Sequence, residues 1–426
     1  MRLLAPLSIY AALLTGLISS MAAQAAPMFA RQYGVSCMTC HAAFPRLNAY
    51  GEEFAANNFR MPNWKDSTLQ TGDDQLALPS QIPMAVRAQA FTQARSAERI
   101  DVETGDRVQA DGDFQAPYLI KLLSSAPLSE HISYYFYGIM AEKGGNGETI
   151  IEDAWFSHDD VFGTGTGMML GQFQVSDLMF PRETRLTFQD YIAYRLAGIT
   201  YERGVVFDHG FGGVDIAVGV VNGNGIKENL TINSPGYQRP DHLFDNDNKK
   251  SVFMRLGTDI GPVSTGLFAY AGEQRNATNP AGGDIEPERY TDKRIAGLDL
   301  SGQIGGNSYW FAQILMNQWD DFINQGSDYD WLAGFIGVDY ITGNRWTYSL
   351  LYNYAEADDF KNSDTVYEGI EMNSLSLNAS YYFMRNLKGV IELNYDLLDE
   401  EQKTGTFWTG HLSSEDYILF GFDAAF

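Results

Sequence analysis

Residues 345–357 read RWTYSLLYNYAEA, and the alternation in this stretch decides the fold class. One set of alternate positions is apolar or aromatic: Trp346, Tyr348, Leu350, Tyr352 and Tyr354. The intervening set is mostly polar or small, with Leu351 as the exception: Thr347, Ser349, Asn353 and Ala355. A period of two places successive side chains on opposite faces of a β-strand. The stretch therefore predicts a strand with one apolar face and one polar face.

The same alternation recurs along most of the chain. It is clear in MNSLSLNASYYF (372–383), in LKGVIELNYDLL (387–398) and in the C-terminal EDYILFGFDAAF (415–426). Sixteen strands are predicted, starting near residues 84, 116, 131, 149, 166, 193, 213, 251, 263, 293, 307, 331, 345, 372, 387 and 415. Long polar stretches alternate with short turns between them; the long ones are 95–115, 222–250, 274–292, 319–330, 356–371 and 399–415.

This asymmetry of the connections distinguishes two β architectures. A soluble sandwich would bury the apolar face against a second sheet and have similar connections at both ends. An outer-membrane barrel has an even number of antiparallel strands, short periplasmic turns and long outer loops. We therefore predict a mainly β chain, an outer-membrane antiparallel barrel of about 16 strands over residues 81–426. The final Phe426 resembles the terminal aromatic of outer-membrane barrel proteins.

Composition restricts the partners. The 426 residues include 24 Tyr, 26 Phe and 42 Gly, a balance typical of β-rich chains, and the formal net charge is −25. Such an acidic chain is unsuited to nucleic acid and attracts cations. After the N-terminal segment, no run of eighteen apolar residues occurs, so the lipid contact we predict is made by strands.

The N-terminus has the pattern of an export signal. Arg2 precedes an apolar stretch from Leu3 to about Ile18, and Ala23-Gln24-Ala25 fits a small-residue cleavage site. The apolar stretch is shorter than the ~20 residues that a membrane-spanning helix requires. We predict a signal peptide at 1–25, with a retained anchor as the alternative.

Both cysteines of the chain lie in one motif, Cys37-Met38-Thr39-Cys40-His41. Cys-x-x-Cys-His is the attachment signature of c-type haem, in which two thiols bind the haem vinyl groups and the histidine ligates the iron. A disulfide, a zinc site and a thioredoxin-like redox pair are the alternatives. Zinc would require further ligands, and the redox pair would require a βαβ context. We predict one covalent haem c, with Cys37 and Cys40 as thioether residues and His41 as the proximal ligand.

Residues 26–80 are predicted to form a small helical cytochrome domain and its linker. Phe44, Leu47, Tyr50/Gly51 and Phe54 recur at helical spacing, with Pro45 near the first turn. Met61 is the first candidate for the second axial ligand, because a thioether stabilises ferrous iron. A purely packing role is its alternative. The rival ligands are His131, His158 and His209, near predicted periplasmic turns, whereas His242 and His411 fall in outer loops.

Residues 27–70 are too few to enclose a haem alone. The interior of a sixteen-stranded barrel is wide enough to supply the missing wall. The domain is therefore expected to dock in or against the periplasmic mouth. A domain hanging free on residues 66–81 is the alternative.

The stretch FARQYGVSCMTCHAAFPRLNAYGEEFAANNF (29–59), followed by a large barrel, resembles the fused cytochrome–porin family of outer-membrane iron oxidases from bacteria that grow on ferrous iron. The residues that carry the resemblance are Phe29, Ala30, Arg31, Gln32, Cys37, Cys40, His41, Pro45, Leu47, Gly51 and Phe54. The resemblance implies a redox enzyme that takes an electron from extracellular Fe(II) and passes it through its haem to a periplasmic carrier, such as a soluble cytochrome c.

Acidic outer loops agree with a cationic donor, because carboxylate oxygens suit hard divalent cations. The candidates for Fe(II) attraction are Asp320, Asp321, Asp358 and Asp359; further acidic positions are Asp101, Glu103, Asp106, Asp111, Asp113, Asp328, Asp330, Glu356, Asp364, Glu368, Asp399, Glu400 and Glu401. Inward-facing Glu392 and Asp396 either extend this attraction or pair with Lys388 or Arg385. The alternative functions are a solute porin with a haem-bearing plug, a conduit that runs outward, and a haem peroxidase.

Overall fold

The structure is a computed structural model of the chain. It describes residues 28–61, 72, 73, 76, 78, 79, 82–95, 98–100, 107–109, 112–141, 150–223, 248–275, 290–323, 325–343, 345–361, 370–398 and 416–426. The predicted signal peptide and most of the linker lie outside these residues, as do His242, His411 and the acidic positions 101, 103, 106, 111, 364, 368 and 399–401.

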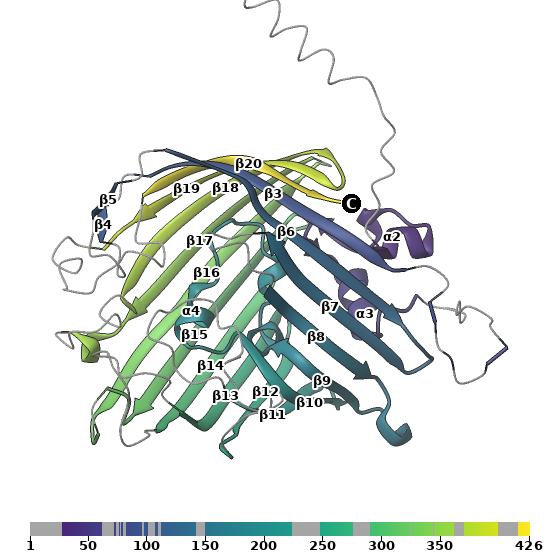
Figure 1. Cartoon of the computed structure of the whole chain (residues 1–426), viewed down its shortest axis with the longest axis horizontal. Coiled ribbons are helices and arrows are strands. Elements are labelled where there is room, and N and C mark those ends of the chain that lie inside the picture. The colour runs from purple at the N-terminus through teal and green to yellow at the C-terminus, as the bar shows by residue number, and fades with distance from the viewer. Residues whose placement is uncertain are drawn as a thin grey trace, which may run out of the picture.

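Sixteen antiparallel strands form a closed barrel (Figure 1). They are β3 (Met84–Arg95), β6 (Asp113–Pro127), β7 (Ile132–Ala141), β8 (Ile150–His158), β9 (Gly167–Gln174), β10 (Tyr201–Phe211), β11 (Val214–Val221), β12 (Ser251–Ile260), β13 (Val263–Arg275), β14 (Tyr290–Ile304), β15 (Ser308–Asp320), β16 (Asp328–Thr342), β17 (Trp346–Glu356), β18 (Met372–Met384), β19 (Leu387–Asp396) and β20 (Tyr417–Ala425). The barrel closes where β20 pairs with β3. The predicted strand number and the antiparallel arrangement are confirmed.

The faces of the strands are also as predicted. On β17 the side chains of Trp346, Tyr348 and Leu350 are exposed on the outer surface, whereas Thr347, Ser349 and Asn353 are buried inside. In β20, Ile418, Phe420 and Phe422 point outward in the same way. The barrel therefore presents an apolar outer surface, as expected of strands that contact lipid.

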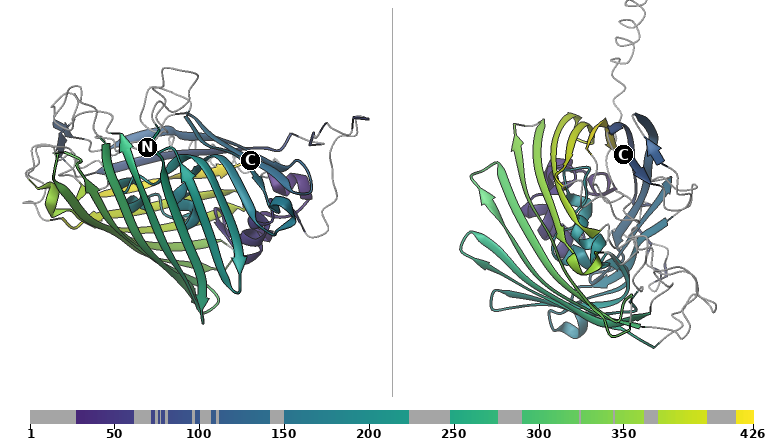
Figure 2. Two further views of the ribbon diagram at one scale, coloured as in Figure 1. Left: turned by 90° about the horizontal axis from the view of Figure 1, so that it is seen from below. Right: turned by 90° about the vertical axis from the view of Figure 1, so that its left-hand side faces the viewer.

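Short and long connections lie at opposite ends of the barrel. The short turns are 128–131, 159–166, 212–213, 261–262, 305–307, 343–345 and 385–386, and we call this end the short-turn mouth. The long connections join the strands at their other ends, and their described parts include a small β4 (Glu98–Ile100) and β5 (Arg107–Gln109) hairpin and η5 (Asp358–Phe360). Figure 2 shows the two ends separated along the barrel axis. A further single turn, η2 (Val161–Gly163), lies at the short-turn mouth.

One strand prediction was wrong. The sixth strand was expected to start near residue 193, but β10 starts at Tyr201 and residue 193 lies in helix α4 (Ile192–Leu196). Residues 175–200, with η3 (Val175–Leu178), η4 (Arg182–Thr184) and α4, form a connection that folds into the barrel (Figures 1 and 2). We call it the internal segment. Its apolar side chains are buried against the inner wall, so its hydrophobicity resembled that of a strand.

The N-terminal segment, residues 28–61, contains α2 (Met28–Tyr33), η1 (Cys37–Thr39), β1 (His41–Ala43), β2 (Arg46–Leu47) and α3 (Ala49–Ala56). The helix expected from about Pro45 was placed too early. It starts at Ala49, because the Asn48 side chain caps its first turn and accepts a hydrogen bond from Gly51 N at 2.9 Å. Phe44 and Leu47 lie in the β1–β2 hairpin instead. In the described residues, none of the helices has the length and apolarity to cross a membrane.

The main apolar core lies between the internal segment and the strands β9 to β18. Tyr191 and Tyr194 of the segment pack on Phe335, with ring centroids 4.4 and 5.4 Å away, and Phe311 lies beside Tyr191. The opposite wall, formed by β3, β6, β19 and β20, faces the segment across charged side chains. The barrel interior is therefore apolar on one side of the segment, and on the other side it combines charged side chains with a smaller apolar cluster.

Candidate functional site in the short-turn mouth

The Cys-x-x-Cys-His loop is tied to the helix that follows it. Asn48 donates from its side-chain amide to the carbonyl oxygens of Met38 and Thr39, at 3.3 and 3.2 Å. Its backbone N–H donates to Cys40 O at 2.9 Å. A Cβ atom on Gly51 would lie 2.0 Å from Cys40 O, so this helix position must be glycine for the loop to pack on α3. One asparagine and one glycine thus fix the backbone around both cysteines.

His41 is oriented for ligation. Its Nδ1 lies 3.0 Å from the carbonyl oxygen of Pro45. A carbonyl oxygen accepts, so Nδ1 carries the proton and Nε2 is the unprotonated nitrogen. Burial lowers the pKa of His41, which favours the neutral imidazole that a metal requires. The Phe44 ring packs against the imidazole at 5.7 Å between centroids and restricts its rotation.

The two thiols are half-buried and are not joined in a disulfide. Burial raises the pKa of Cys37 and of Cys40, so both are protonated at neutral pH. The chain therefore carries two thiols and one unprotonated imidazole nitrogen within five consecutive residues. This donor set fits a covalent haem c, for which Cys37 and Cys40 would be the attachment points and His41 the iron ligand.

An aromatic cluster joins the N-terminal segment to the barrel wall. Phe29 packs on Phe54 and Phe59, each at 5.1 Å between ring centroids. Phe59 in turn stacks with Tyr135 of β7 and Trp155 of β8, both at 6.1 Å. Aromatic pairs of this kind contribute about 1 kcal/mol each beyond the area they bury. The predicted core residue Phe54 thus packs within the segment, and Phe59 links that core to the barrel.

Polar anchors hold the segment at two places on the mouth. Arg46 forms an ion pair with Asp339 of β16 and lies over the rings of Tyr309 and Phe311, at 4.7 and 5.4 Å. Near the other end of the segment, Arg60 pairs with Asp159. These contacts favour the docked arrangement over a free domain.

A third group of anchors lies between these two. Asn58 donates to His131 O at 3.1 Å and accepts from Ser133 and Ser157 at 3.0 and 2.6 Å. The Tyr382 hydroxyl donates to Phe44 O at 2.5 Å, and Arg87 lies over the Phe44 ring at 5.2 Å. Sequence reasoning singled out His131, as a candidate ligand, but not Ser133, Ser157, Tyr382 or Arg87. The sequence feature that could have indicated them is a polar or basic side chain on the inward face of a predicted strand.

The candidate second ligands remain predictions. The Tyr50 hydroxyl donates to Met61 Sδ at 2.8 Å, which holds this thioether on α3. His131 and His158 stack on each other at 5.5 Å, and His131 Nδ1 lies 2.8 Å from Asp159 Oδ1. His209 Nδ1 contacts Thr166 Oγ1 at 3.2 Å. All three histidines lie at the short-turn mouth, as expected, and His131 is the one that contacts the N-terminal segment through its backbone.

The four loop aspartates lie at the opposite, long-loop end, and each has a local partner. Asp320 pairs with Arg294 at 3.1 Å, and Asp358 pairs with Lys361 at 2.5 Å. Asp321 accepts from Gly326 N within its own turn, and Asp359 accepts from Asp330 N at 2.8 Å. Within the described ranges, no three His, Cys, Asp or Glu side chains gather in a way that would hold a metal ion.

The internal segment is held by Glu392 of β19. This buried carboxylate accepts hydrogen bonds from Phe188 N, Gln189 N, Asn378 and Tyr417, at 2.5, 2.8, 2.7 and 2.9 Å. Lys388 and Arg385 were predicted as possible partners of Glu392, but neither is among its hydrogen-bond donors. Lys388 instead lies 3.7 Å from Asp423. Glu392 is therefore a structural anchor.

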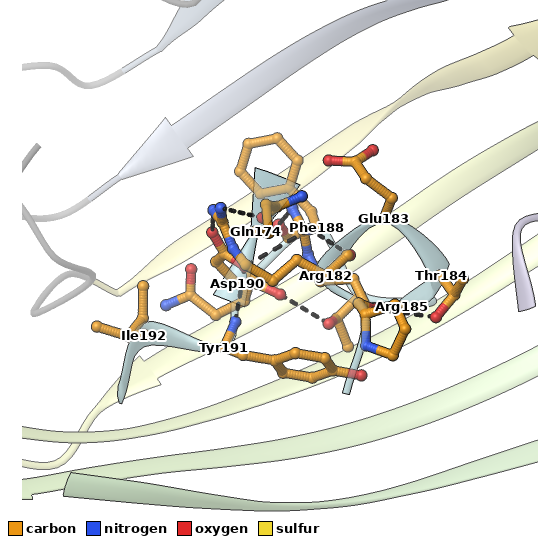
Figure 3. Close-up of polar contacts among 12 residues, drawn as sticks. Gln174, Arg182, Glu183, Thr184, Arg185, Phe188, Asp190, Tyr191 and Ile192 are labelled. Carbon is orange, nitrogen blue, oxygen red and sulfur yellow. Dashed lines mark hydrogen bonds and ion pairs between the residues drawn. The ribbon is translucent and has the colours of Figure 1, made fainter. Parts of the chain in front are cut away.

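Within the segment, Arg182 forms a bidentate pair with Asp190 and donates to Gln174 at 3.0 Å (Figure 3). The Asp190 backbone continues into Tyr191 and Ile192, which pack on the apolar wall. The same short stretch is thus fixed by an ion pair on one side and by aromatic packing on the other.

The barrel has the fold of outer-membrane porins. The outer membrane channel DcaP of Acinetobacter baumannii is similar with a TM-score of 0.55 at 11% identity, over 81% of this chain and 97% of that one. OmpF of Salmonella typhi in complex with daunomycin gives a TM-score of 0.51 at 12% identity, over 80% of this chain and 97% of that one. An anion-selective porin from Comamonas acidovorans gives a TM-score of 0.51 at 13% identity, over 81% of this chain and 99% of that one. No family model and no curated protein matches the chain. At these identities, the likeness defines the fold alone.

Proposed function

We propose that this protein is an outer-membrane electron-transfer protein that oxidises an external donor, Fe(II), at a haem c held in the periplasmic mouth of a porin-like barrel. The observation that carries the proposal is the Cys37–His41 loop. Its two thiols and its Nδ1-protonated imidazole form a donor set that suits haem c, and the ion pairs of Arg46 and Arg60 hold the N-terminal segment that carries this loop at the short-turn mouth. Haem c supplies a one-electron centre, so each Fe(II) is oxidised to Fe(III) as one electron passes to a periplasmic carrier such as a soluble cytochrome c.

The residues of the chain have separate tasks in this proposal. His41 presents Nε2 to the iron, and Asn48 and Gly51 keep the attachment loop in place. Asp320, Asp321, Asp358 and Asp359 raise the local concentration of cations at the long-loop end. The apolar outer surface of the barrel contacts membrane lipid. No proton transfer is required, because outer-sphere electron transfer needs neither acid nor base.

The decisive experiment uses outer membranes that contain the full chain under anaerobic conditions. Covalent haem is first verified by mass spectrometry of the peptide around Cys37, and the ferrous-haem absorption band is followed after addition of Fe(II). We expect rapid reduction that is lost in His41→Ala and retained in His242→Ala, a matched substitution of a histidine that the sequence places in an outer loop. Reduction by dithionite without reduction by Fe(II) would reject Fe(II) as the donor and favour an outward conduit or a porin that carries haem.

A solute porin is the second candidate, and the porin fold favours it. An open pore predicts large, stable single-channel conductance of the full chain in planar bilayers. The internal segment and the N-terminal segment both occupy the lumen, so our proposal predicts a small conductance. A conductance close to that of general porins, together with no reduction by Fe(II), would support the porin.

A further inference from the structure

A cavity lies between the internal segment and the barrel wall formed by β3, β6, β19 and β20. It comprises about 680 Å³ of space not filled by atoms, part of it open to solvent. Five basic side chains line it: Arg87, Lys121, Arg182, Arg185 and Lys388. Three acidic side chains line it: Glu152, Glu183 and Asp423. With all of them ionised, the lining carries two more positive than negative charges, and one more when Asp190, the partner of Arg182 and Arg185, is included, in a chain whose net charge is −25.

The carboxylates of this lining are shared between cations. Asp423 lies 2.8 Å from Arg87 and 3.7 Å from Lys388. Glu183 lies 2.7 Å from Lys121 and 3.6 Å from Arg87. Each of these two acids therefore faces two basic groups, and Arg87 is common to both. Because buried cations require compensation, the local excess of positive charge favours a further anion in the cavity.

The internal segment adds a second observation. Arg182 and Arg185 share Asp190, with Arg185 at 3.5 Å. The Nε atoms of Arg185 and of the neighbouring Arg195 are buried and have no hydrogen-bond partner among the described residues. Two other acidic residues of the interior, Asp153 and Asp177, do not line the cavity and are not counted in its charge. Asp177 is already bonded to Arg182 N, and burial raises its pKa to about 7.

We propose that this cavity is an anion site that takes a group with one or two negative charges on carboxylate or oxyanion oxygens. Arg87, Arg185 and Lys388 supply the donors, since guanidinium and ammonium groups form charge-assisted hydrogen bonds to such oxygens. Two sources have this chemistry. One is a dissolved oxyanion such as phosphate, which enters through the lumen.

The other source is the pair of propionates on the haem c of the proposed function, and this source rests on that proposal. Arg87 connects the cavity to the candidate haem site, because it lies over the Phe44 ring, which packs against His41. With either source, the positive lining disfavours the passage of iron cations past the internal segment.

The test measures binding of inorganic phosphate by calorimetry at low ionic strength, using the purified full chain with covalent haem and a Cys37→Ser/Cys40→Ser variant without it. Circular dichroism verifies that both barrels are folded. Binding to both proteins assigns the site to a dissolved oxyanion. Binding to the haem-free variant alone assigns it to the propionates. Binding to neither overturns the proposal. If mass spectrometry finds no covalent haem in the wild type, the proposed function fails, and phosphate binding still decides the anion site.

Site variants locate the binding. Arg185→Gln and Lys388→Gln are expected to weaken phosphate binding about tenfold or more, the usual effect of losing one charge-assisted hydrogen bond. Arg255→Gln is the matched control, because Arg255 forms an inward ion pair with Asp299 at 2.6 Å but does not line the cavity. Equal weakening by Arg255→Gln, or unchanged binding in both cavity variants, would place the anion elsewhere and overturn the assignment.

Discussion

Two segments occupy the interior of this barrel, and they are held in different ways. The N-terminal segment, at the short-turn mouth, contacts the wall through a few ion pairs, hydrogen bonds and aromatic pairs, and Cys37 and Cys40 stay half-buried. The internal segment is packed more deeply, with Tyr191, Tyr194 and Leu196 buried against the wall and its backbone bonded to Glu392. The first resembles a docked module, and the second is part of the barrel core.

The internal segment is therefore expected to contribute mainly to the stability of the barrel, and the N-terminal segment mainly to its function. Loss of contacts around the internal segment should destabilise the whole barrel, because that segment belongs to the largest apolar core. Loss of contacts around the N-terminal segment should release or distort that segment while the barrel stays folded. The following substitutions test this distinction, from the largest expected effect to the smallest.

Glu392→Ala should lower the free energy of unfolding by about 4 kcal/mol, because four hydrogen-bond donors lose one buried charged acceptor. Urea unfolding followed by tryptophan fluorescence measures it. Glu356→Ala, at an exposed position of β17, is the control and should change little. A loss below 1 kcal/mol would mean that the internal segment is not anchored through this carboxylate.

Arg46→Gln should release the N-terminal segment from β16 at a cost of about 3 kcal/mol in docking, because the buried Asp339 loses its cation. Hydrogen exchange should increase in residues 28–61 and stay unchanged in the barrel strands. The double variant Arg46→Gln/Asp339→Asn should recover part of the protection. Equal exchange in the single variant and the wild type would show that this pair does not hold the segment.

Gly51→Ala should destabilise the packing of the attachment loop on α3 by about 2 kcal/mol. The added Cβ would lie 2.0 Å from Cys40 O, so the helix must shift. Covalent haem per chain, measured by mass spectrometry, should decrease while the barrel remains folded. Glu53→Ala, at an exposed position of the same helix, is the control. Full haem content in Gly51→Ala would show that this close approach is dispensable.

Asp358→Asn/Asp359→Asn should have the smallest effect, about a twofold decrease in the rate of haem reduction at low Fe(II) and low ionic strength. Exposed charges act through a screened long-range field, so the effect should vanish in high salt. Stopped-flow absorbance at two salt concentrations measures it. A decrease that persists in high salt would indicate direct ligation of Fe(II) instead.

Much of the barrel was predictable because its signal is local. Alternation in 345–357 and in 415–426 gave the strands and their outward faces, and the positions of the turns gave sixteen strands. Residues from about 193 to 200 were mistaken for the start of a strand, because periodicity reports that a side chain is buried and not what covers it. The helix start at Ala49 was missed for a similar reason: the capping role of Asn48 decided it, and apolar spacing alone did not.

The sequence by itself determined the Cys37–Cys40–His41 donor set, because the required spacing lies within five residues. Only the tertiary structure decided that Pro45 O binds His41 Nδ1, that Arg46 reaches Asp339, and that Glu392 holds the internal segment. The last two contacts join residues about 200 or more positions apart, and closure of the barrel brings them together. A linear pattern carries no information on such distances, because register and closure belong to the whole sheet.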